Sequence, residues 1–291
     1  MTYNIENAFD TIHDEGKDDY EYCPNGERHW TRYRLFKKLR NIMKVITAAD
    51  IDRPVDIIAL CEVENDTVMN YLLHRTKLNK LGYKYIMTNS ADSRGIDVAL
   101  IYSPFTFHPI ETQHIRAYLP EHYTRDILRV SGTITEGDTL DVYAVHLPSK
   151  RGGSKAMARS ITITKMLKHN ADSIRQSRQH PNIIIMGDYN AEPKSPQLKL
   201  LTKDGMLTDT SAKLKPGTYK YQGNWSIIDH ILTHTTTLLP KETHILTLPF
   251  LTEKDETNGG IKPSRTYLGP VYKGGTSDHL PVFMRFEIGN D

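Results

Sequence analysis

The chain has 291 residues, of which 38% are hydrophobic and 25% are charged. Lys and Arg number 37 against 35 Asp and Glu, and the resulting formal net charge of +2 excludes a global electrostatic preference for nucleic acid or a membrane surface, so any anion must be bound locally. No run approaches the length of about 18 apolar residues that a transmembrane helix needs, and we expect one domain over residues 1–291.

The first residues show no charged segment followed by an apolar one, so they are unlike a signal peptide. Residues 1–5 instead predict a strand, which would fit an exported protein whose leader has been removed; the sequence leaves the compartment open. The two cysteines cannot build a disulfide framework. Cys61 lies in an apolar run typical of a small buried residue, and a Cys23–Cys61 bridge stays open.

The N-terminal part predicts short strands separated by helices and loops. Residues 1–6 alternate as a strand does, and the polar run Asp10–Glu27 predicts a long surface loop. Apolar residues spaced by three and four predict a helix within Thr31–Ala49. The apolar run Val55–Cys61 predicts a strand that places Glu62 at its carboxyl end.

The same pattern continues along the middle of the chain. Asp66 can cap a helix that runs to about Leu81. Strands are then expected on both sides of the polar turn 89–95, followed by a hairpin that ends at His146. These strands are Tyr83–Thr88, Asp97–Tyr102, Leu128–Thr135 and Thr139–Val145.

The last part predicts two helices, within residues 154–179 and 195–203, and a polar, glycine-rich loop or exposed hairpin over 252–275. Further strands are expected at Ile183–Met186, Ser226–Thr233, Leu246–Phe250 and Leu280–Ile288. Strands occur throughout with helices between them, a distribution that favours one layered α/β domain.

The stretch Ile183–Pro193 carries a chemical pattern at the end of a buried strand. Gly187 lets the backbone turn tightly, and Asp188 and Asn190 share one face in extended geometry because they are two residues apart. The carboxylate can accept a proton or bind a metal while the amide donates a hydrogen bond, a pairing that suits phosphate chemistry. An Asx-type turn explains the same residues equally well, so these residues alone do not distinguish a turn from a catalytic site.

Other polar residues occupy similar places, in or at the carboxyl ends of strands or just before the last strand. Each alone can be a turn former or a satisfied buried polar group, but together they predict one site if the strands form one packed unit. The residues are Asn4, Glu62, His146, Asp188, Asn190, Asp229, Asp278 and His279.

Six segments in this order resemble the motifs of the endonuclease/exonuclease/phosphatase family, which includes DNase I. The segments are Thr2–Ile5, Leu60–Val63, Val145–Ser149, Gly187–Asn190, Ile228–Ile231 and Ser277–Val282. The Gly-Asp-x-Asn and Ser-Asp-His motifs are specific only as an ordered set. The resemblance implies an α/β (α+β) fold, a four-layered sandwich of two central mixed β-sheets flanked by helices. It also implies hydrolysis of a phosphate ester with Mg²⁺ or Mn²⁺.

The resemblance implies roles for the metal and water groups. Glu62 would be the direct metal ligand, with Asn4 and Asp278 close by, and such oxygen ligands suit Mg²⁺ or Mn²⁺. No Ser or Cys stands in an obvious nucleophile setting, so the attacking group would be water. Asp188 would orient or deprotonate that water, and Asn190 would donate to the phosphate.

The resemblance also implies roles for two histidines. His279 would donate to a phosphoryl oxygen, while Asp229 would accept from its other ring nitrogen and favour the protonated form. His146 occupies a position where some relatives have a histidine and others a tyrosine. The sequence leaves two roles open for His146, that of a leaving-group acid and that of a phosphate ligand.

Several cations are candidates for substrate binding. Arg125 resembles a phosphate-contacting arginine of the DNase I branch, and a surface ion pair with Asp126 or a neighbour is the alternative. Lys150 and Arg151 could form a cationic lip beside His146.

The loop before Asp278 holds an arginine and two tyrosines that could cover a substrate or merely order the loop. They are Arg265, Tyr267 and Tyr272.

The sequence therefore favours a metal-dependent phosphodiesterase with nucleic acid as substrate. A phosphatase or phospholipase-type enzyme acting on phosphoinositides, sphingomyelin or small phosphate esters is the alternative, because a nonspecific DNA-binding protein usually has a basic surface. A noncatalytic binding module on the same fold is a third hypothesis, which is disfavoured because no inert residue replaces a core position of the motifs. No protein partner is implied.

Overall fold

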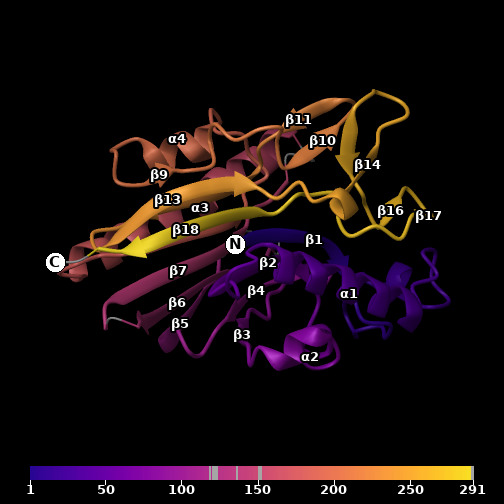
Figure 1. Cartoon of the computed structure of the whole chain (residues 1–291). Helices are drawn as coiled ribbons and strands as arrows, with labels where there is room; N and C mark the ends of the chain where they lie inside the picture. Colours follow the sequence, from indigo (N-terminus) through magenta and orange to yellow (C-terminus); the bar gives the residue numbers. More distant parts are fainter. Residues whose placement is uncertain (118, 120–123, 136, 150–152, 290–291) are drawn as a thin grey trace.

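The computed structural model of the protein describes residues 1–117, 119, 124–135, 137–149 and 153–289. Two six-stranded sheets form its centre, and each contains both parallel and antiparallel neighbours (Figure 1). Buried residues of α1 and α2 join an apolar cluster with the first sheet, and those of α3 and α4 join a second cluster with the other sheet. The expected sandwich of two mixed sheets flanked by helices is confirmed.

The first sheet has the order β13-β18-β1-β2-β4-β3. Its strands are β1 (Thr2–Ala8), β2 (Ile57–Val63), β3 (Lys84–Met87), β4 (Asp97–Tyr102), β13 (Leu238–Ile245) and β18 (Val282–Ile288). Strand β1 lies in the middle, parallel to β2 and antiparallel to β18, with Thr2 opposite both Ala59 and Val282. The first and last strands of the chain are therefore neighbours, indigo beside yellow in Figure 1.

The second sheet has the order β5-β6-β7-β8-β12-β9. Its strands are β5 (Phe107–Ile115), β6 (Ile127–Ile134), β7 (Thr139–His146), β8 (Ile183–Asp188), β9 (Thr208–Asp209) and β12 (Asp229–His234). Strand β8 runs parallel to β7 and antiparallel to β12, so the carboxyl ends of β7 and β8 lie beside the start of β12.

The helices are α1 (Arg32–Ala48), α2 (Asp66–His74), α3 (Gly153–Ser177) and α4 (Pro196–Thr202). The hydroxyl of Thr31 caps α1 by accepting from the Arg34 N–H. Three hairpins complete the fold: β10 (Tyr219–Tyr221) with β11 (Asn224–Ser226), β14 (Thr252–Lys254) with β15 (Ile261–Pro263), and β16 (Tyr267–Leu268) with β17 (Val271–Tyr272).

Some expected elements differ from the structure. The strand expected at Leu246–Phe250 is wrong: the strand is β13, and Pro249–Leu251 forms a 3-10 turn. Strand β13 lies at a sheet edge and exposes charged residues, so it lacks the apolar run that marks a central strand. Helix α2 is capped by Asn65 rather than Asp66 and ends at His74.

The space between the two sheets contains a cavity at one end. The cavity has a volume of about 520 Å³ and opens between the sheets where β2 and β7 begin and β18 ends.

Both cysteines are free, and the Cys61 thiol donates to the carbonyl oxygen of Val145 at 3.3 Å. Among the helices of the described residues, none is long and apolar enough to span a membrane.

Candidate active site

The predicted site residues of the second sheet lie in a row across three adjacent strands. His146 ends β7 and lies opposite Asp188 at the end of β8, and Asp188 in turn lies opposite Asp229 at the start of β12. From the first sheet, the Asn4 amide donates to Asp188 Oδ2 at 3.0 Å and lies 3.3 Å from Glu62 Oε1. Side chains of both sheets therefore meet at one edge of the sandwich, as the sequence predicted.

Gly187 is required by close approach to the neighbouring strand. Its φ is +152°, and a Cβ at this position would lie 1.9 Å from the carbonyl oxygen of Val145. The glycine lets β7 and β8 stay together up to their last residues. As a result, His146 and Asp188 emerge side by side.

Glu62 is aimed into the site by an irregularity in its strand. The pairing of β2 with β4 shifts register between Cys61 and Val63, and Glu62 itself has a φ of +67°. Its Oε2 accepts from the Asn7 N–H at 2.8 Å, and its side chain is 14% exposed. One carboxylate oxygen is thus held by backbone while the other faces Asn4.

Asp188 is buried and accepts hydrogen bonds on both oxygens. Oδ1 accepts from the Asn190 N–H at 2.7 Å, and Oδ2 accepts from the Asn4 amide. Burial, followed by the charge of Asp229, raises the pKa of Asp188 to about 7, although the neighbouring His279 lowers it. A carboxylate with a pKa near neutrality suits a general base.

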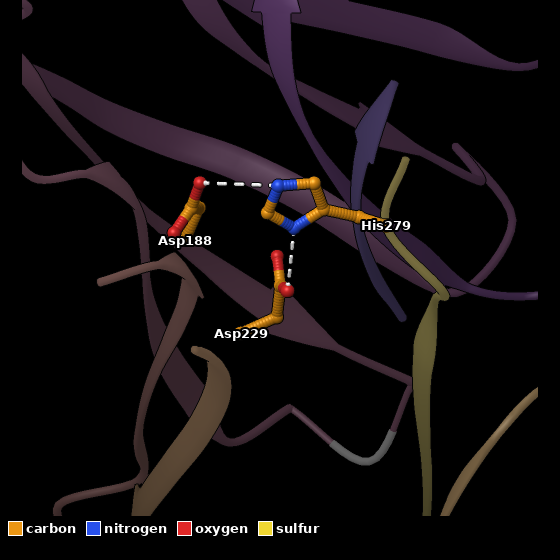
Figure 2. Close-up of side chains that lie close together, drawn as sticks. All are labelled: Asp188, Asp229 and His279. Carbon is orange, nitrogen blue, oxygen red and sulfur yellow. Dashed lines mark hydrogen bonds and ion pairs between the residues drawn. The ribbon is translucent and has the colours of Figure 1, made fainter. Parts of the chain in front are cut away.

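His279 forms a pair with Asp229 and points at Asp188 (Figure 2). Its Nδ1 lies 2.8 Å from Asp229 Oδ2, and its Nε2 lies 3.9 Å from Asp188 Oδ2. Burial opposes the charged ring, but Asp229 by charge and hydrogen bond, together with nearby carboxylates, holds the pKa of His279 well above its usual value. The geometry favours an imidazolium with Nε2–H directed into the site.

His146 lies on the other side of Asp188 and has the opposite electrostatic surroundings. Its Nε2 is 3.6 Å from Asp188 Oδ2 and 3.9 Å from Glu62 Oε1, while its buried Nδ1 has no hydrogen-bond partner among the described residues. Burial, then the charges of Arg125 and Arg94, hold the pKa of His146 well below its usual value. Asp188 is therefore flanked by two histidines whose pKa values are shifted in opposite directions.

Two further predicted residues adjoin this centre through other contacts. Asp278 Oδ2 accepts from Arg265 Nη2 at 2.5 Å. Asn190 has a φ of +49°, and its amide donates to the carbonyl oxygen of Leu147 at 3.0 Å, which fixes its side chain between the ends of β7 and β8.

The predicted substrate-binding cations are only partly described. Arg125 is buried and donates to Asp92 Oδ2 and to the Leu147 carbonyl oxygen, both at 3.1 Å. The alternative pairing with Asp126 is wrong, because Asp126 pairs with Arg116 at 2.8 Å. Lys150 and Arg151 lie outside the described residues.

Two neighbours of the centre had no role in the sequence analysis. The ring of Tyr219 lies 5.1 Å from the ring of His279 between centroids, and Arg94 is close enough to His146 to lower its pKa. Both stand in polar segments, where no hydrophobic period or motif distinguishes them from ordinary loop residues.

Within the described residues, two groups of side chains have the spacing of a metal site. One contains Asp188, Asp229 and His279, of which the last two bind each other. The other, Asp14, Asp19 and Glu64, lies in the long N-terminal loop and at the end of β2. Burial raises the pKa of Glu64 to about 9, so this carboxyl is protonated at neutral pH.

A family model described as endonuclease/exonuclease/phosphatase family matches residues 1–288. No curated protein matches the sequence. Among solved structures, a Bacteroides thetaiotaomicron mannosyl-6-phosphatase superposes with a TM-score of 0.61 at 16% identity, covering 99% of this chain and 98% of that chain. A D. rerio TDP2 complexed with a single-stranded DNA product gives 0.59 at 16% identity, covering 87% and 93%. At such identities these two likenesses establish the fold.

Proposed function

Because the chain belongs to the endonuclease/exonuclease/phosphatase family and is therefore a phosphoester hydrolase, we propose that it is a divalent-metal-dependent phosphodiesterase acting on nucleic acid. One observation supports the catalytic part of this proposal. A buried carboxylate, Asp188, stands between two histidines at the edge where both sheets meet, with the pKa of His146 lowered and that of His279 raised. That arrangement supplies a base and two hydrogen-bond donors to one phosphate.

The donor set fits a hard divalent cation. Glu62 Oε1 has only long contacts, 3.3 Å to the Asn4 amide nitrogen and 3.9 Å to His146 Nε2, and carboxylate oxygens are preferred ligands of Mg²⁺ and Mn²⁺. The Asn4 amide oxygen instead accepts from the Glu6 N–H at 3.0 Å. Glu62 would hold the ion, with Asn4 and Asp278 close by. When bound, such an ion neutralises charge on the phosphoryl oxygens.

The base in this mechanism is Asp188. Its Oδ2 accepts a proton from a water molecule as the water oxygen attacks phosphorus. The ester P–O bond breaks, its electron pair leaves on the ester oxygen, and that oxygen takes a proton from solvent. The Asn190 N–H and the Asn4 amide hold the carboxylate in one orientation, so the base is positioned before substrate arrives. Asn190 keeps a second amide hydrogen for the phosphate.

The two histidines donate to the phosphoryl group in different charge states. The imidazolium of His279 stabilises the negative charge that grows on a phosphoryl oxygen. For His146, the carboxylates near Nε2 and the unpartnered Nδ1 favour a neutral ring with its proton on Nε2. His146 then acts as a phosphate ligand, since a ring with so low a pKa carries no spare proton for the leaving group.

The test compares wild type with Asp188→Asn on bis-p-nitrophenyl phosphate, plasmid DNA and RNA in the presence of Mg²⁺ or Mn²⁺. We expect hydrolysis by wild type and a loss of about 10³-fold or more in the variant, because an amide cannot accept the proton. Asp172→Asn serves as control, because Asp172 pairs with Lys168 on the surface of α3. Absence of any diester hydrolysis by wild type would rule out the proposal.

A phosphomonoesterase is the second candidate. The superposition with the mannosyl-6-phosphatase covers almost the full length of both chains. The near-neutral net charge of this chain also suits a small substrate. Mannose 6-phosphate and inositol phosphates, which are monoesters, therefore belong in the same panel, whereas sphingomyelin, itself a diester, tests the phospholipase-type alternative. A kcat/KM for one of these monoesters that exceeds all diester values would replace the phosphodiesterase proposal.

A further inference from the structure

Arg265 lies beside the active centre and has no part in the mechanism above. Its Nη2 donates to Asp278 Oδ2 at 2.5 Å, whereas its buried Nε has no hydrogen-bond partner among the described residues. The side chain is 30% exposed, so a substrate can reach it. Burial opposes the charge, but Asp278, Glu6 and Tyr219 raise the pKa of Arg265. It is a permanent cation with donors to spare.

Two buried charged side chains hold the backbone next to Arg265. The Glu6 carboxylate accepts from the N–H groups of Thr266 at 2.6 Å and Tyr267 at 3.2 Å. The Lys38 ammonium on α1 donates to Thr266 Oγ1 at 2.6 Å and to the Thr276 carbonyl oxygen at 3.0 Å.

Burying these two charges is costly. Burial raises the pKa of Glu6 to about 7 and lowers the pKa of Lys38 to about 8. A surface loop needs no such anchors, whereas a residue that must hold a fixed position beside a substrate does.

Tyr219 lies near both His279 and Arg265. Its ring packs against that of His279, and it is close enough to Arg265 to affect the pKa of that guanidinium. The hairpin that carries it, β10–β11, is tied to the β14–β15 hairpin, because Lys220 Nζ donates to the carbonyl oxygens of Gly259 and Ile261 (Figure 1). Tyr219 thus lies on a hairpin that contacts the β14–β15 hairpin, which ends two residues before Arg265.

The position of Arg265 relative to His279 indicates which group it can bind. His279 Nε2 faces Asp188, where the scissile phosphate must lie, whereas the polar contacts of Arg265 are with Asp278 and, at 4.0 Å, Glu6. Arg265 therefore does not belong to the residues that contact the scissile phosphate, and it lies on the same side of the site as His279. A guanidinium there can reach an anion that neighbours the scissile phosphate.

We propose that Arg265 binds a second phosphate of the substrate, adjacent to the scissile one, while Tyr219 packs against the nucleoside that joins the two. This inference rests on the proposed phosphodiesterase function and makes Arg265 a specificity-determining residue. The substrate class is a nucleotide ester with a neighbouring phosphate. The matching probes are the p-nitrophenyl ester of thymidine 5′-phosphate and the same ester carrying a 3′-phosphate.

In the test, kcat and KM are measured for both esters with wild type, Arg265→Met and Arg265→Lys. We expect Arg265→Met to lower kcat/KM for the 3′-phosphorylated ester by about 10- to 100-fold, mainly through KM, because a charge-assisted hydrogen bond is lost. The ester without the 3′-phosphate should change by less than about threefold. Arg265→Lys should recover part of the loss, because the charge remains without the fork.

The matched control is Arg34→Met. Arg34 stacks over Tyr272 at 4.2 Å and donates to the carbonyl oxygen of Arg28, so it supports the same loop without contacting Asp278. It should leave the ratio of the two kcat/KM values unchanged. An equal loss on both esters in Arg265→Met would make Arg265 only a positioning residue for Asp278 and would overturn the inference. No loss on either ester would overturn it too.

Calorimetric titration with thymidine 3′,5′-bisphosphate and thymidine 5′-monophosphate separates this inference from the proposed function. Tighter binding of the bisphosphate by wild type, lost in Arg265→Met, supports the subsite even if neither ester is hydrolysed. Failure of wild type to hydrolyse either ester counts against the phosphodiesterase. Equal affinity of wild type for the two nucleotides counts against the subsite.

Discussion

A hydrogen bond 2.8 Å long between His279 and Asp229 sets the charge at the centre. We expect Asp229→Asn to lower kcat by about 10²- to 10⁴-fold with little change in KM, because the histidine loses the carboxylate that keeps it protonated. In wild type the raised pKa of His279 keeps the imidazolium present into alkaline pH; in the variant that pKa falls. The alkaline limb of the pH–kcat profile should therefore move to lower pH.

The pair can also be tested as a unit. If Asp229 acts through His279, the double variant Asp229→Asn/His279→Gln should be no slower than His279→Gln alone, because effects within one unit are not additive. Multiplicative losses would show that Asp229 has a separate role.

His230, next to Asp229 on β12, provides a pH-dependent contribution to stability. Its ring lies between two acceptors, Asp209 Oδ2 and the Ala191 carbonyl oxygen, each at 2.9 Å, so both bonds form only when the ring is doubly protonated. Burial opposes this, but Asp209 raises the pKa of His230 above that of the unfolded chain. The stabilisation is therefore complete below the unfolded pKa of about 6.5 and is lost as pH rises through the folded pKa.

Urea unfolding of wild type and His230→Gln between pH 5 and 10 measures this contribution. The difference in unfolding free energy should be about 1.5–3 kcal/mol at acid pH and should shrink toward alkaline pH. A difference that is constant across the range would mean that His230 does not titrate between the two states.

At the scale of elements, the approach of β7 to β8 depends on one glycine. Gly187→Ala should destabilise the fold by about 3 kcal/mol or more, because the new Cβ meets the Val145 carbonyl oxygen and the backbone of both strands must move. Gly205→Ala is the matched control: its φ is also positive, at +65°, but a Cβ there meets nothing within 4 Å. Gly205→Ala should lower the free energy of unfolding by only about 1–2 kcal/mol.

The sequence predicts elements and site residues for different physical reasons. The sequence predicts buried strands such as β4 and β8 because each contains an uninterrupted run of at least four apolar residues. Edge strands β5 and β13 were missed, since their exposed faces are polar and only pairing with a neighbour defines them.

The site follows the same division. The strand-end residues fall in motifs whose order is visible in the sequence. The register shift that turns Glu62 inward, and the meeting of Tyr219 with His279, depend on tertiary contacts that no local pattern records.

For the molecule as a whole, the convergence of carboxylates at one edge predicts linkage between metal and stability. Chelation should abolish activity, and Mg²⁺ or Mn²⁺ should restore it. Because the ion would bind only the folded chain, a concentration about 100 times its Kd should add about 2.7 kcal/mol to the unfolding free energy. When thermal unfolding is followed at increasing Mg²⁺ concentration, the Tm should rise in wild type and should not change in Glu62→Gln. An equal rise in both would place the ion elsewhere.

Strand β1 sits between β2 and β18, and the Ser277 hydroxyl donates to the Asn4 carbonyl oxygen at 2.7 Å. The centre thus combines a residue from the first strand with one that immediately precedes the last. On the ribosome, the chain must be made through His279 before the pair with Asp229 can form. Until β18 is made, one side of β1 lacks its partner and offers an open edge for pairing with other chains. Activity should therefore appear only after β18 has been made, and aggregation is most favoured in the interval before that.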